Sequence, residues 1–368
     1  MLKAEQGLKL RTVRLIELRD DGVGLEAFVV IDHDLFPVSA GGTRMLPDVD
    51  LEEVTRLARA MTWKHAAFHL PYAGAKAGVR FASGNREALL VAYKLALKPY
   101  SEIFLTGPDM GTFPADFIED SDDPAPLWAL SHEGLGMDDL ATGHGVKAAA
   151  EAGLAHLART LEGATVAVEG FGKVGAGTAR ACARAGARIV GVSTVHGLVT
   201  DSTGLDVEDL LTLRERHGDR FVEHASSKVR PREALFELEC DVLVPGARPH
   251  SITAAVAQRL RCAVVSPAAN IPYGAGSLDV LHRRGVVAVP DFMSNGGGNF
   301  LYELDQNKGP AEALAAIEVL VHERVVRVLA TAEDLRITPY AGALRDARNY
   351  VAQATDASAE MLDELFSI

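Results

Sequence analysis

The sequence contains few cysteines. The three among its 368 residues are Cys182, Cys240 and Cys262, and they are too scattered for a disulfide framework or a thiolate metal site. We therefore expect buried thiols in a reducing compartment. Long apolar runs are also absent: no segment reaches the roughly 18 residues of a membrane-spanning helix. Residues 1–21 carry charges throughout, unlike a signal peptide. We expect a cytoplasmic protein without a membrane partner.

Positive charge is scarce as well. The chain has 37 Lys and Arg residues against 50 Asp and Glu residues, which gives a formal net charge of −13. Nucleic-acid binders gather Lys and Arg on one face to replace the counterions of the phosphate backbone. We therefore expect no nucleic-acid partner and favour a small-molecule ligand. The length suits two domains, since single cores rarely grow beyond roughly 250 to 300 residues.

Two kinds of pattern divide the chain. The first hundred residues mix short β-type runs with helices, one of which has Asp50 as a plausible N-cap and a single apolar stripe between Leu51 and Met61. From Leu161 onward, apolar runs alternate with helical or loop segments. Continuous apolar runs spaced in this way indicate a parallel sheet covered on both faces. The runs are ATVAVEGFG, ARIVGVST, CDVLVPGA, CAVVSPAAN and GVVAVPDFMSNGGG.

A glycine turn follows the first of these runs. It has the pattern G-x-G-x-x-G and leads into an alanine-rich segment with helical composition. The first glycine permits a tight turn, the second lets the backbone approach a pyrophosphate, and the third lets helix and strand pack closely. The helix N-terminus then offers N–H groups to the phosphates. We predict a dinucleotide site formed by Gly170, Phe171, Gly172, Lys173, Val174 and Gly175.

One expected part of such a site is missing. The second strand ends in Ser193 and Thr194, where an acidic residue usually binds the ribose 2′-hydroxyl. Without that carboxylate a 2′-phosphate is not repelled, and Arg188 and His196 lie nearby in sequence. Thr194 is retained as a cofactor-binding candidate, and the choice between NAD and NADP stays open.

Two lysines are candidates for chemistry in the first domain. Lys64 ends the segment MTWK, and Lys76 lies among small residues in PYAGAKAG, where a ligand could approach closely. Two neighbouring ammonium groups lower each other's pKa, and burial acts in the same direction. One amine could then act as a base near neutral pH while the other binds a carboxylate. On spacing alone, two solvated lysines remain the alternative.

Seven segments of the sequence resemble those of the Glu/Leu/Phe/Val amino-acid dehydrogenase family, in the same order over roughly residues 35 to 305. They are GGTRM, MTWK with PYAGAKAG, GPDMGT, ATGHGV, GFGKVG, PAAN and SNGGG. Members of that family oxidatively deaminate L-amino acids to 2-oxo acids and ammonia with NAD or NADP. The resemblance implies the same reversible reaction, no metal, and a homo-oligomer of two to eight subunits assembled through the first domain.

The resemblance also implies an α/β architecture of two domains with a cleft between them. We place a substrate and oligomerisation domain at 1–140 and a Rossmann, doubly wound dinucleotide-binding domain at 141–334. A last helical segment, at about 335–368, can pack back on either domain. Closure of the cleft would exclude water from the reaction.

The roles of single residues follow from the matching motifs. Lys64 matches the lysine that binds the substrate α-carboxylate, and Lys76 the one that activates the attacking water. Asp109 matches the aspartate that handles the amino-group proton. The matching substrate and cofactor positions are Gly42 and Asn295 for the substrate, and Thr142, Ala268, Asn270 and again Asn295 for the cofactor.

The sequence departs from the family at the positions that select the substrate. Glutamate dehydrogenases carry a lysine where this chain has Ala40, and a small residue where it has Tyr302. We therefore expect an apolar branched-chain or aromatic substrate rather than glutamate. The altered segment around Asn299 leaves two alternatives open: a polar or non-standard amino acid as substrate, and a catalytically weak regulatory subunit or amino-acid sensor of the same family.

Overall fold

The computed structural model describes residues 14–118 and 125–367, so the first 13 residues of the charged N-terminal segment lie outside the described residues. The chain forms two compact units, Met1–Asp122 with Ala347–Ile368 and Asp123–Asp346. The sequence placed the boundaries at 140 and 334 instead. The first boundary differs because helix α3, Met137–His156, packs along α4 and α10 of the second unit, so the residues just before 140 belong to that unit.

The first unit is built on a six-stranded sheet. Its strand order is β1-β2-β5-β3-β6, and β4 pairs with β5 beyond the end of β3. Strands β1 and β2 are antiparallel, as are β2 and β5, whereas β3 and β4 run parallel to β5. The central strand β5 is therefore bordered on both edges. The strands are β1 Arg14–Asp20, β2 Leu25–Ile31, β3 Ser39–Ala40, β4 Thr43–Leu46, β5 Ala73–Arg80 and β6 Phe104–Leu105.

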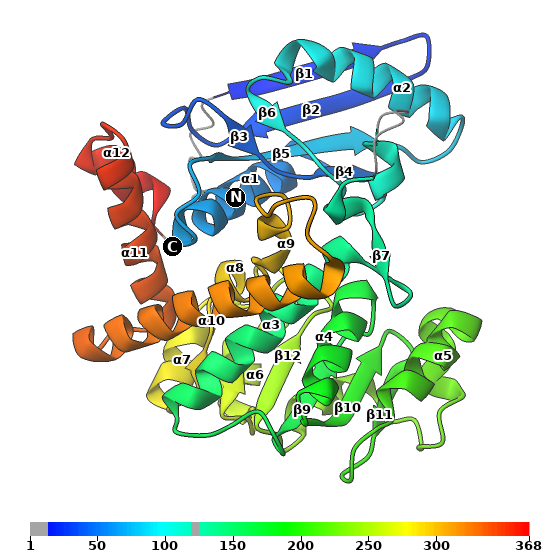
Figure 1. Ribbon diagram of the computed structural model, residues 1–368, viewed down its shortest axis with the longest axis vertical. Helices are drawn as coiled ribbons and strands as arrows, with labels where there is room; N and C mark the ends of the chain where they lie inside the picture. Colours follow the sequence, from blue (N-terminus) through cyan, green and yellow to red (C-terminus); the bar gives the residue numbers. More distant parts are fainter. Residues whose placement is uncertain (1–13, 119–124, 368) are drawn as a thin grey trace, which may run out of the picture. The chain divides into compact units, whose positions relative to one another are not determined.

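Two helices cover opposite faces of this sheet. Alternate residues of a strand point to opposite faces, and Val29 of β2 packs in the cluster that includes residues of α2, Arg86–Leu97. Its neighbour Val30 packs in the cluster that includes residues of α1, Leu51–Ala67. The predicted N-cap is present, because Asp50 Oδ1 accepts a hydrogen bond of 2.7 Å from the Glu53 N–H. Figure 1 shows both helices beside the strands.

The end of the chain completes the first unit. Helix α11, Pro339–Ala354, begins in the second unit and ends in the first, and α12, Ala359–Leu365, follows it. Arg59 Nη1 of α1 donates to the Glu364 carbonyl at 2.9 Å, and Trp63 Nε1 donates to the Leu365 carbonyl at 2.7 Å. These bonds satisfy carbonyls at the end of α12 that have no partner inside the helix, and so fix α12 to α1.

The second unit contains the predicted doubly wound sheet. Its order is β11-β10-β9-β12-β13-β14, with every neighbouring pair parallel except β10 and β11. The first strand of the pattern, β9, lies near the centre, and the order reverses on its two sides, which confirms the expected architecture. The strands are β9 Thr165–Glu169, β10 Arg188–Thr194, β11 Gly197–Thr200, β12 Val242–Pro245, β13 Val264–Val265 and β14 Val287–Ala288.

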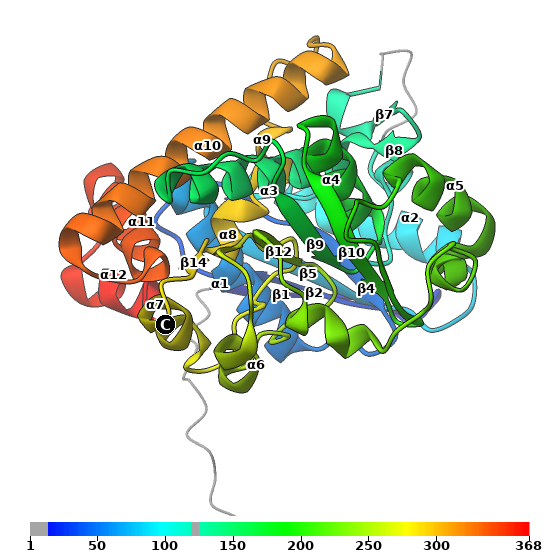
Figure 2. The ribbon, with the colours of Figure 1, turned by 90° about the horizontal axis from the view of Figure 1, so that it is seen from below.

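Helices lie on both sides of this sheet. Figure 2 shows α3, α4 and α10 on one side and α6 and α7 on the other. All three cysteines are buried and free. None of the described helices is long and apolar enough to cross a membrane. The remaining elements are β7 Ser131–His132, β8 Leu135–Gly136, α4 Lys173–Arg184, α5 Val207–His217, α6 Ala254–Arg259, α7 Ser277–Arg283, α8 Asp291–Ser294, α9 Gly297–Phe300 and α10 Pro310–Leu335.

Candidate functional site

Lys76 and Asp109, the two predicted catalytic residues, form an ion pair in the first unit. The Nζ of Lys76 on β5 lies 2.9 Å from Asp109 Oδ2, and the two side chains are 8% and 20% exposed. Arg44 of β4 donates from Nε to the same carboxylate oxygen at 2.9 Å, and its Nη1 donates to Glu53 Oε1 at 2.6 Å. One carboxylate thus contacts two cations, one of which was not predicted.

The electrostatic state of Asp109 follows from these contacts. Burial by itself raises the pKa of the Asp109 carboxyl, but the charges of Lys76 and Arg44 and their hydrogen bonds outweigh it, so the pKa lies well below its usual range. Asp109 is therefore ionised at neutral pH. The fixed negative charge holds the Lys76 ammonium in place.

A glycine keeps space open beside this pair. A Cβ on Gly42 would lie 3.3 Å from Lys76 Nζ, 3.1 Å from Asp109 Cβ and 2.9 Å from the Pro108 carbonyl oxygen. These separations are shorter than ordinary van der Waals contact, so any other residue would press on the ion pair. The absence of a side chain at Gly42 leaves room for a small group next to the Lys76 amine.

Lys64 lies on the helix that packs against the strand of Lys76. It is buried near the C-terminal end of α1, with 8% of the residue exposed. Thr62 fixes this turn, because its hydroxyl donates to Asp32 Oδ2 at 2.6 Å and accepts from the Gly74 N–H of β5 at 3.2 Å. Gly74 of β5 is also in register with Ala40 of the parallel strand β3. The predicted proximity of the two lysine amines stays a prediction.

The glycine turn of the second unit has the predicted geometry. Gly170 has a φ of +83°, which favours glycine. A Cβ on Gly175 would lie 2.0 Å from the Gly170 carbonyl oxygen, so only glycine allows α4 to start this close to β9. A Cβ on Gly172 would meet nothing within 4 Å. Gly172 is the N-cap residue of α4, so no side chain at this position caps the first N–H groups of the helix.

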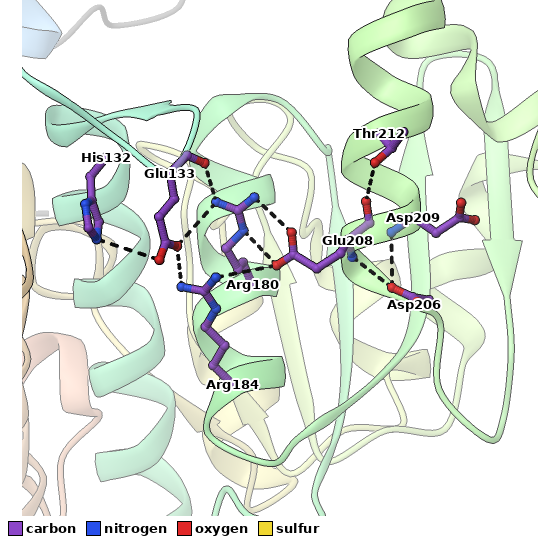
Figure 3. A network of polar contacts seen from close by, with 8 residues as sticks. All are labelled: His132, Glu133, Arg180, Arg184, Asp206, Glu208, Asp209 and Thr212. Carbon is purple, nitrogen blue, oxygen red and sulfur yellow. Dashed lines mark hydrogen bonds and ion pairs between the residues drawn. The ribbon is translucent and has the colours of Figure 1, made fainter.

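A polar network fixes the helix that follows this turn (Figure 3). Arg180 of α4, with an 11% exposed side chain, donates from Nη1 to the Glu133 carbonyl at 2.8 Å and pairs from Nε with Glu208 Oε1 at 3.0 Å. Arg184 also pairs with both of these glutamates. Glu133 joins β7 to β8, and Glu208 lies in the first turn of α5. The network therefore holds α4 between the turn that joins β7 to β8 and the first turn of α5.

Several of the predicted cofactor residues meet near the ends of β13 and β14. Asn295 is 4% exposed. Its Nδ2 donates to the Ala269 carbonyl and to Asn270 Oδ1, both at 3.1 Å, and lies 3.5 Å from the Ala268 carbonyl. Its Oδ1 is buried without a hydrogen bond from any described residue. A buried acceptor left open is costly unless a ligand or water completes it, so Asn295 offers an acceptor to a bound molecule.

Thr142 lies against the glycine-rich segment. Its hydroxyl donates to the Asp138 carbonyl at 3.0 Å, and a Cβ on Gly298 would lie 2.7 Å from its Oγ1. A Cβ on Gly297 would lie 2.1 Å from the Ala141 carbonyl oxygen. The two glycines therefore allow α9 to pack directly on α3, which positions Thr142.

Tyr302 stacks on an aromatic residue that the sequence reading did not single out. Its ring lies 5.5 Å from that of Trp128, with 25° between the planes, and 41% of Tyr302 is exposed. The pair presents a flat apolar surface with a hydroxyl group at one end. No pattern in the sequence connects two aromatic residues 174 positions apart in this way.

Asp139 is a second residue that sequence reasoning missed. Burial, with a smaller repulsion from Asp138, raises the pKa of Asp139 to about 6, although Lys173 opposes the shift. Lys173 Nζ lies 3.7 Å from Asp139 Oδ2. The acidic side chain thus contacts the first residue of the helix that follows the glycine turn. Its only signal in the sequence was the pair of adjacent aspartates, Asp138 and Asp139, which lie in the first turn of α3.

One cavity lies away from the predicted catalytic, substrate-binding and cofactor-binding residues, although Arg188 lines it. It has a volume of about 840 Å³ and opens at the amino ends of the parallel strands, where Thr165, Arg188, Asp241 and Cys262 line it. Ligands of doubly wound folds bind at the carboxyl ends of the strands, so we do not assign this cavity to the dinucleotide. Among the described residues, no group of three His, Cys, Asp or Glu side chains could hold a metal ion.

Comparisons with known proteins agree with these observations. Residues 134–358 match the model of the Glutamate/Leucine/Phenylalanine/Valine dehydrogenase family, and residues 11–117 match its dimerisation domain. An NAD-specific glutamate dehydrogenase of Staphylococcus aureus is 31% identical over 317 residues, which are 80% of this chain and 75% of that protein. An NADP-specific glutamate dehydrogenase of Saccharolobus shibatae is 30% identical over 281 residues, 70% of this chain and 65% of that protein.

Solved structures give the same result. The hetero-hexameric glutamate dehydrogenase from Thermus thermophilus, in its Leu-bound form, is 28% identical, with a TM-score of 0.79 over 94% of this chain and 89% of that chain. The two family models together cover most of the chain. The predicted family is thus confirmed: the chain belongs to the Glutamate/Leucine/Phenylalanine/Valine dehydrogenases, oxidoreductases that act on amino acids with NAD or NADP.

Proposed function

We propose that this protein reversibly deaminates an apolar branched-chain or aromatic L-amino acid to the 2-oxo acid and ammonia. The observation that carries the proposal is the buried pair of Lys76 and Asp109, with a glycine leaving space beside the amine. A surface ion pair would need neither burial nor an adjacent gap. A confined amine and carboxylate are the groups that proton transfer on a small substrate requires.

The second unit fits a nicotinamide dinucleotide. Gly172 leaves the N-terminus of α4 open, and Gly175 lets that helix approach β9, so Gly170 to Gly175 would hold the pyrophosphate. The open Oδ1 of Asn295, together with Asn270, Ala268 and Thr142, would hold the nicotinamide end. When bound, the cofactor accepts a hydride from the substrate Cα at C4 of its ring.

The roles of the protein side chains follow from their charges. Lys64 would bind the α-carboxylate as a fixed cation. Asp109, kept ionised by its two cations, would accept a proton from the substrate ammonium so that the nitrogen lone pair can support hydride loss. Lys76, once its ammonium has released a proton, would then take a proton from the water that attacks the resulting iminium carbon. Collapse of this adduct breaks the C–N bond and releases ammonia and the 2-oxo acid.

Two positions support an apolar substrate. Ala40 has no charge to pair with a side-chain carboxylate, and Tyr302 with Trp128 forms an aromatic surface. The relatives named above are glutamate dehydrogenases, so the proposed preference differs from the substrate in their names. A polar or non-standard amino acid would use the Tyr302 hydroxyl instead, and the substrate screen below separates the two.

The experiment is a spectrophotometric screen of the purified protein. Each amino acid is mixed with NAD or NADP, and reduced nicotinamide is measured. We expect turnover with leucine- or phenylalanine-like substrates, at least tenfold above glutamate in kcat/KM. Lys76→Ala should lower kcat by about 10²-fold or more, the usual range for a general base. Turnover that survives Lys76→Ala would contradict the assigned mechanism.

A second candidate function is a regulatory subunit or amino-acid sensor. The observation that favours it is the hetero-hexameric, Leu-bound relative from Thermus thermophilus. Intact Lys76 and Asp109 favour catalysis instead, because regulation alone does not require a buried amine and carboxylate in contact. Amino-acid binding without turnover on any amino acid would favour the regulatory function.

We also propose a cytoplasmic homo-oligomer. Residues 11–117 match a dimerisation domain, and the relative from Thermus thermophilus is a hexamer. Three buried, free cysteines suit a reducing compartment. Light scattering on the purified protein would give the number of subunits, and a monomer at micromolar concentration would contradict the assembly.

A further inference from the structure

Strand β10 ends in a residue that cannot serve the cofactor in the expected way. Thr194 is 7% exposed. Its hydroxyl donates to the Asp219 carbonyl at 2.9 Å and accepts from the His196 N–H at 3.1 Å. The hydroxyl is therefore used in holding two other segments. Thr194 acts as an anchor, and the group that meets the ribose must come from elsewhere.

The segment held by Thr194 is the short helix η4, Gly218–Glu223. It has a second anchor in the glycine turn, because the ring of Phe221 packs 5.2 Å from that of Phe171 and both rings are almost completely buried. Phe171 lies between the first two glycines of the turn. The helix η4 is thus fixed at both places that a dinucleotide site of this fold uses, the glycine turn and the end of the second strand.

Among the charged residues of η4, Arg220 and Glu223 pair with each other, whereas Asp219 does not take part in this pair. Asp219 is exposed, and its carboxylate makes no hydrogen bond or ion pair with any described residue. Its neighbour Arg220 pairs with Glu223, at 2.9 and 3.2 Å from the two carboxylate oxygens. The available charge beside the end of β10 is therefore negative. The backbone of Asp219 is fixed there by its bond to Thr194, which keeps the carboxylate within one side-chain length of the strand end.

The cations suggested by the sequence do not change this balance. Arg188 is the first residue of β10, and its Nη1 donates to the Ser202 carbonyl at 3.1 Å. The two ends of a seven-residue strand lie roughly 20 Å apart. Arg188 is therefore far from the Thr194 end of β10, where a 2′-phosphate would bind. His196 is exposed, and His217 stacks on His224 with 3.8 Å between ring centroids.

We propose that Asp219 supplies the carboxylate that is missing from the end of β10, and that the protein therefore prefers NAD to NADP. The carboxylate would accept hydrogen bonds from the ribose 2′-hydroxyl and repel a 2′-phosphate. The inference rests on the proposed use of the glycine turn for a dinucleotide. It assigns cofactor choice to a residue 25 positions downstream of Thr194.

The test is equilibrium binding without amino acid. NADH and NADPH are titrated into the full-length protein at pH 8.5, above the ordinary pKa of histidine, and nicotinamide fluorescence gives each Kd. We expect the wild type to bind NADH at least tenfold more tightly than NADPH. Asp219→Asn should weaken NADH binding about tenfold, as expected for a lost charged hydrogen bond, and should bring the two Kd values within about threefold. Glu215→Gln, an exposed acidic residue of α5, should change neither.

A second variant keeps the proposal falsifiable if the first one folds poorly. Asp219→Ser removes the same carboxylate with a smaller side chain at this exposed position, and should likewise bring the two Kd values within about threefold. An unchanged Kd ratio in a folded variant of Asp219, or a wild type that prefers NADPH, overturns the role of Asp219. Failure of the wild type to bind either dinucleotide would instead contradict the proposed function. The two failures are therefore distinguishable.

Discussion

The Lys76 amine and the Asp109 carboxylate lie 2.9 Å apart, and both side chains are largely buried. Arg44 pairs with the same carboxylate oxygen and also with Glu53. The chain of contacts from Lys76 through Asp109 and Arg44 to Glu53 therefore alternates in charge. Alternating charges lower the cost of keeping an amine and a carboxylate out of water. Under the proposed function, Arg44 is a positioning residue that acts on the chemistry through Asp109.

Arg44→Gln should change the pH dependence of the reaction. Removing one cation raises the pKa of Asp109 toward its ordinary value, because burial then meets less opposition. The acid limb of kcat/KM should move to higher pH, and Arg44→Lys should restore part of the shift. The wild-type contribution of Asp109 to stability is present above its ordinary pKa of 3.8 and is lost as the pH falls below it. The Arg44→Gln variant should therefore lose less stability than the wild type as the pH falls through this range.

The measurement is a pH profile of kcat/KM with acid unfolding followed in parallel. Arg56→Gln, which removes an exposed arginine paired with Glu52 on α1, is the control and should leave the profile in place. A profile that is identical in Arg44→Gln would show that Asp109 does not set the acid limb.

Gly42→Ala should damage catalysis more than folding. The new Cβ would lie 3.3 Å from Lys76 Nζ and 2.9 Å from the Pro108 carbonyl oxygen, and the backbone cannot yield as a flexible side chain would. We expect kcat/KM to fall by about 10²-fold, as small displacements of catalytic groups do. Gly309→Ala, where a Cβ meets nothing within 4 Å, is the matched control. Equal activity of the two variants would contradict the proposal that the substrate uses the space that Gly42 leaves beside Lys76.

The doubly wound unit was predictable because its signals are local. Each strand is a continuous apolar run, and each glycine of the turn has a backbone reason to be glycine: Gly170 has a positive φ, and Gly175 lies against a carbonyl oxygen. Such requirements act on a few adjacent residues. Helix α1 was predictable for the same reason, through its cap and its apolar stripe.

The rest of the candidate site depends on contacts between distant positions. Arg44 was visible only as part of a motif, because its partner Asp109 lies 65 residues away. Trp128 carries no signal for its contact with Tyr302. The sequence showed that Thr194 stands where an acidic residue is usual. It could not show the bond of Thr194 to the Asp219 backbone, because that bond depends on the folding of η4. Tertiary contacts of this kind leave no periodic pattern in a single sequence.

Asp139→Asn should stabilise the protein at alkaline but not at acidic pH. The pKa of Asp139 in the folded protein is raised to about 6 from 3.8. Ionising it in the folded state therefore costs free energy, up to about 3 kcal/mol at 1.36 kcal/mol per pKa unit. Its favourable contribution is complete below pH 3.8 and is lost as the pH rises through 6. Asparagine removes this loss while keeping the shape.

Thermal unfolding at pH 4 and pH 8 measures the effect. The variant and the wild type should have similar Tm values at pH 4, and the variant should be a few degrees more stable at pH 8. Glu215→Gln serves as the exposed control and should show no such difference between the two pH values. A variant that is less stable at pH 8 would mean that the contact with Lys173 outweighs the cost of burial.

Ala40→Lys with Tyr302→Ser should raise activity on glutamate. The lysine adds a cation for the side-chain carboxylate, and the serine removes the aromatic ring that stacks on Trp128. A charged hydrogen bond contributes about 1.5 to 3 kcal/mol, so kcat/KM on glutamate should rise by at least tenfold relative to leucine. Ala40→Met with Tyr302→Ser matches the added length without the charge and should not favour glutamate. If both double variants respond equally to glutamate, the added charge does not meet the substrate side chain, and Ala40 is not a specificity position. A gain confined to the lysine variant would instead show that the missing charge at Ala40 is what disfavours glutamate in this chain.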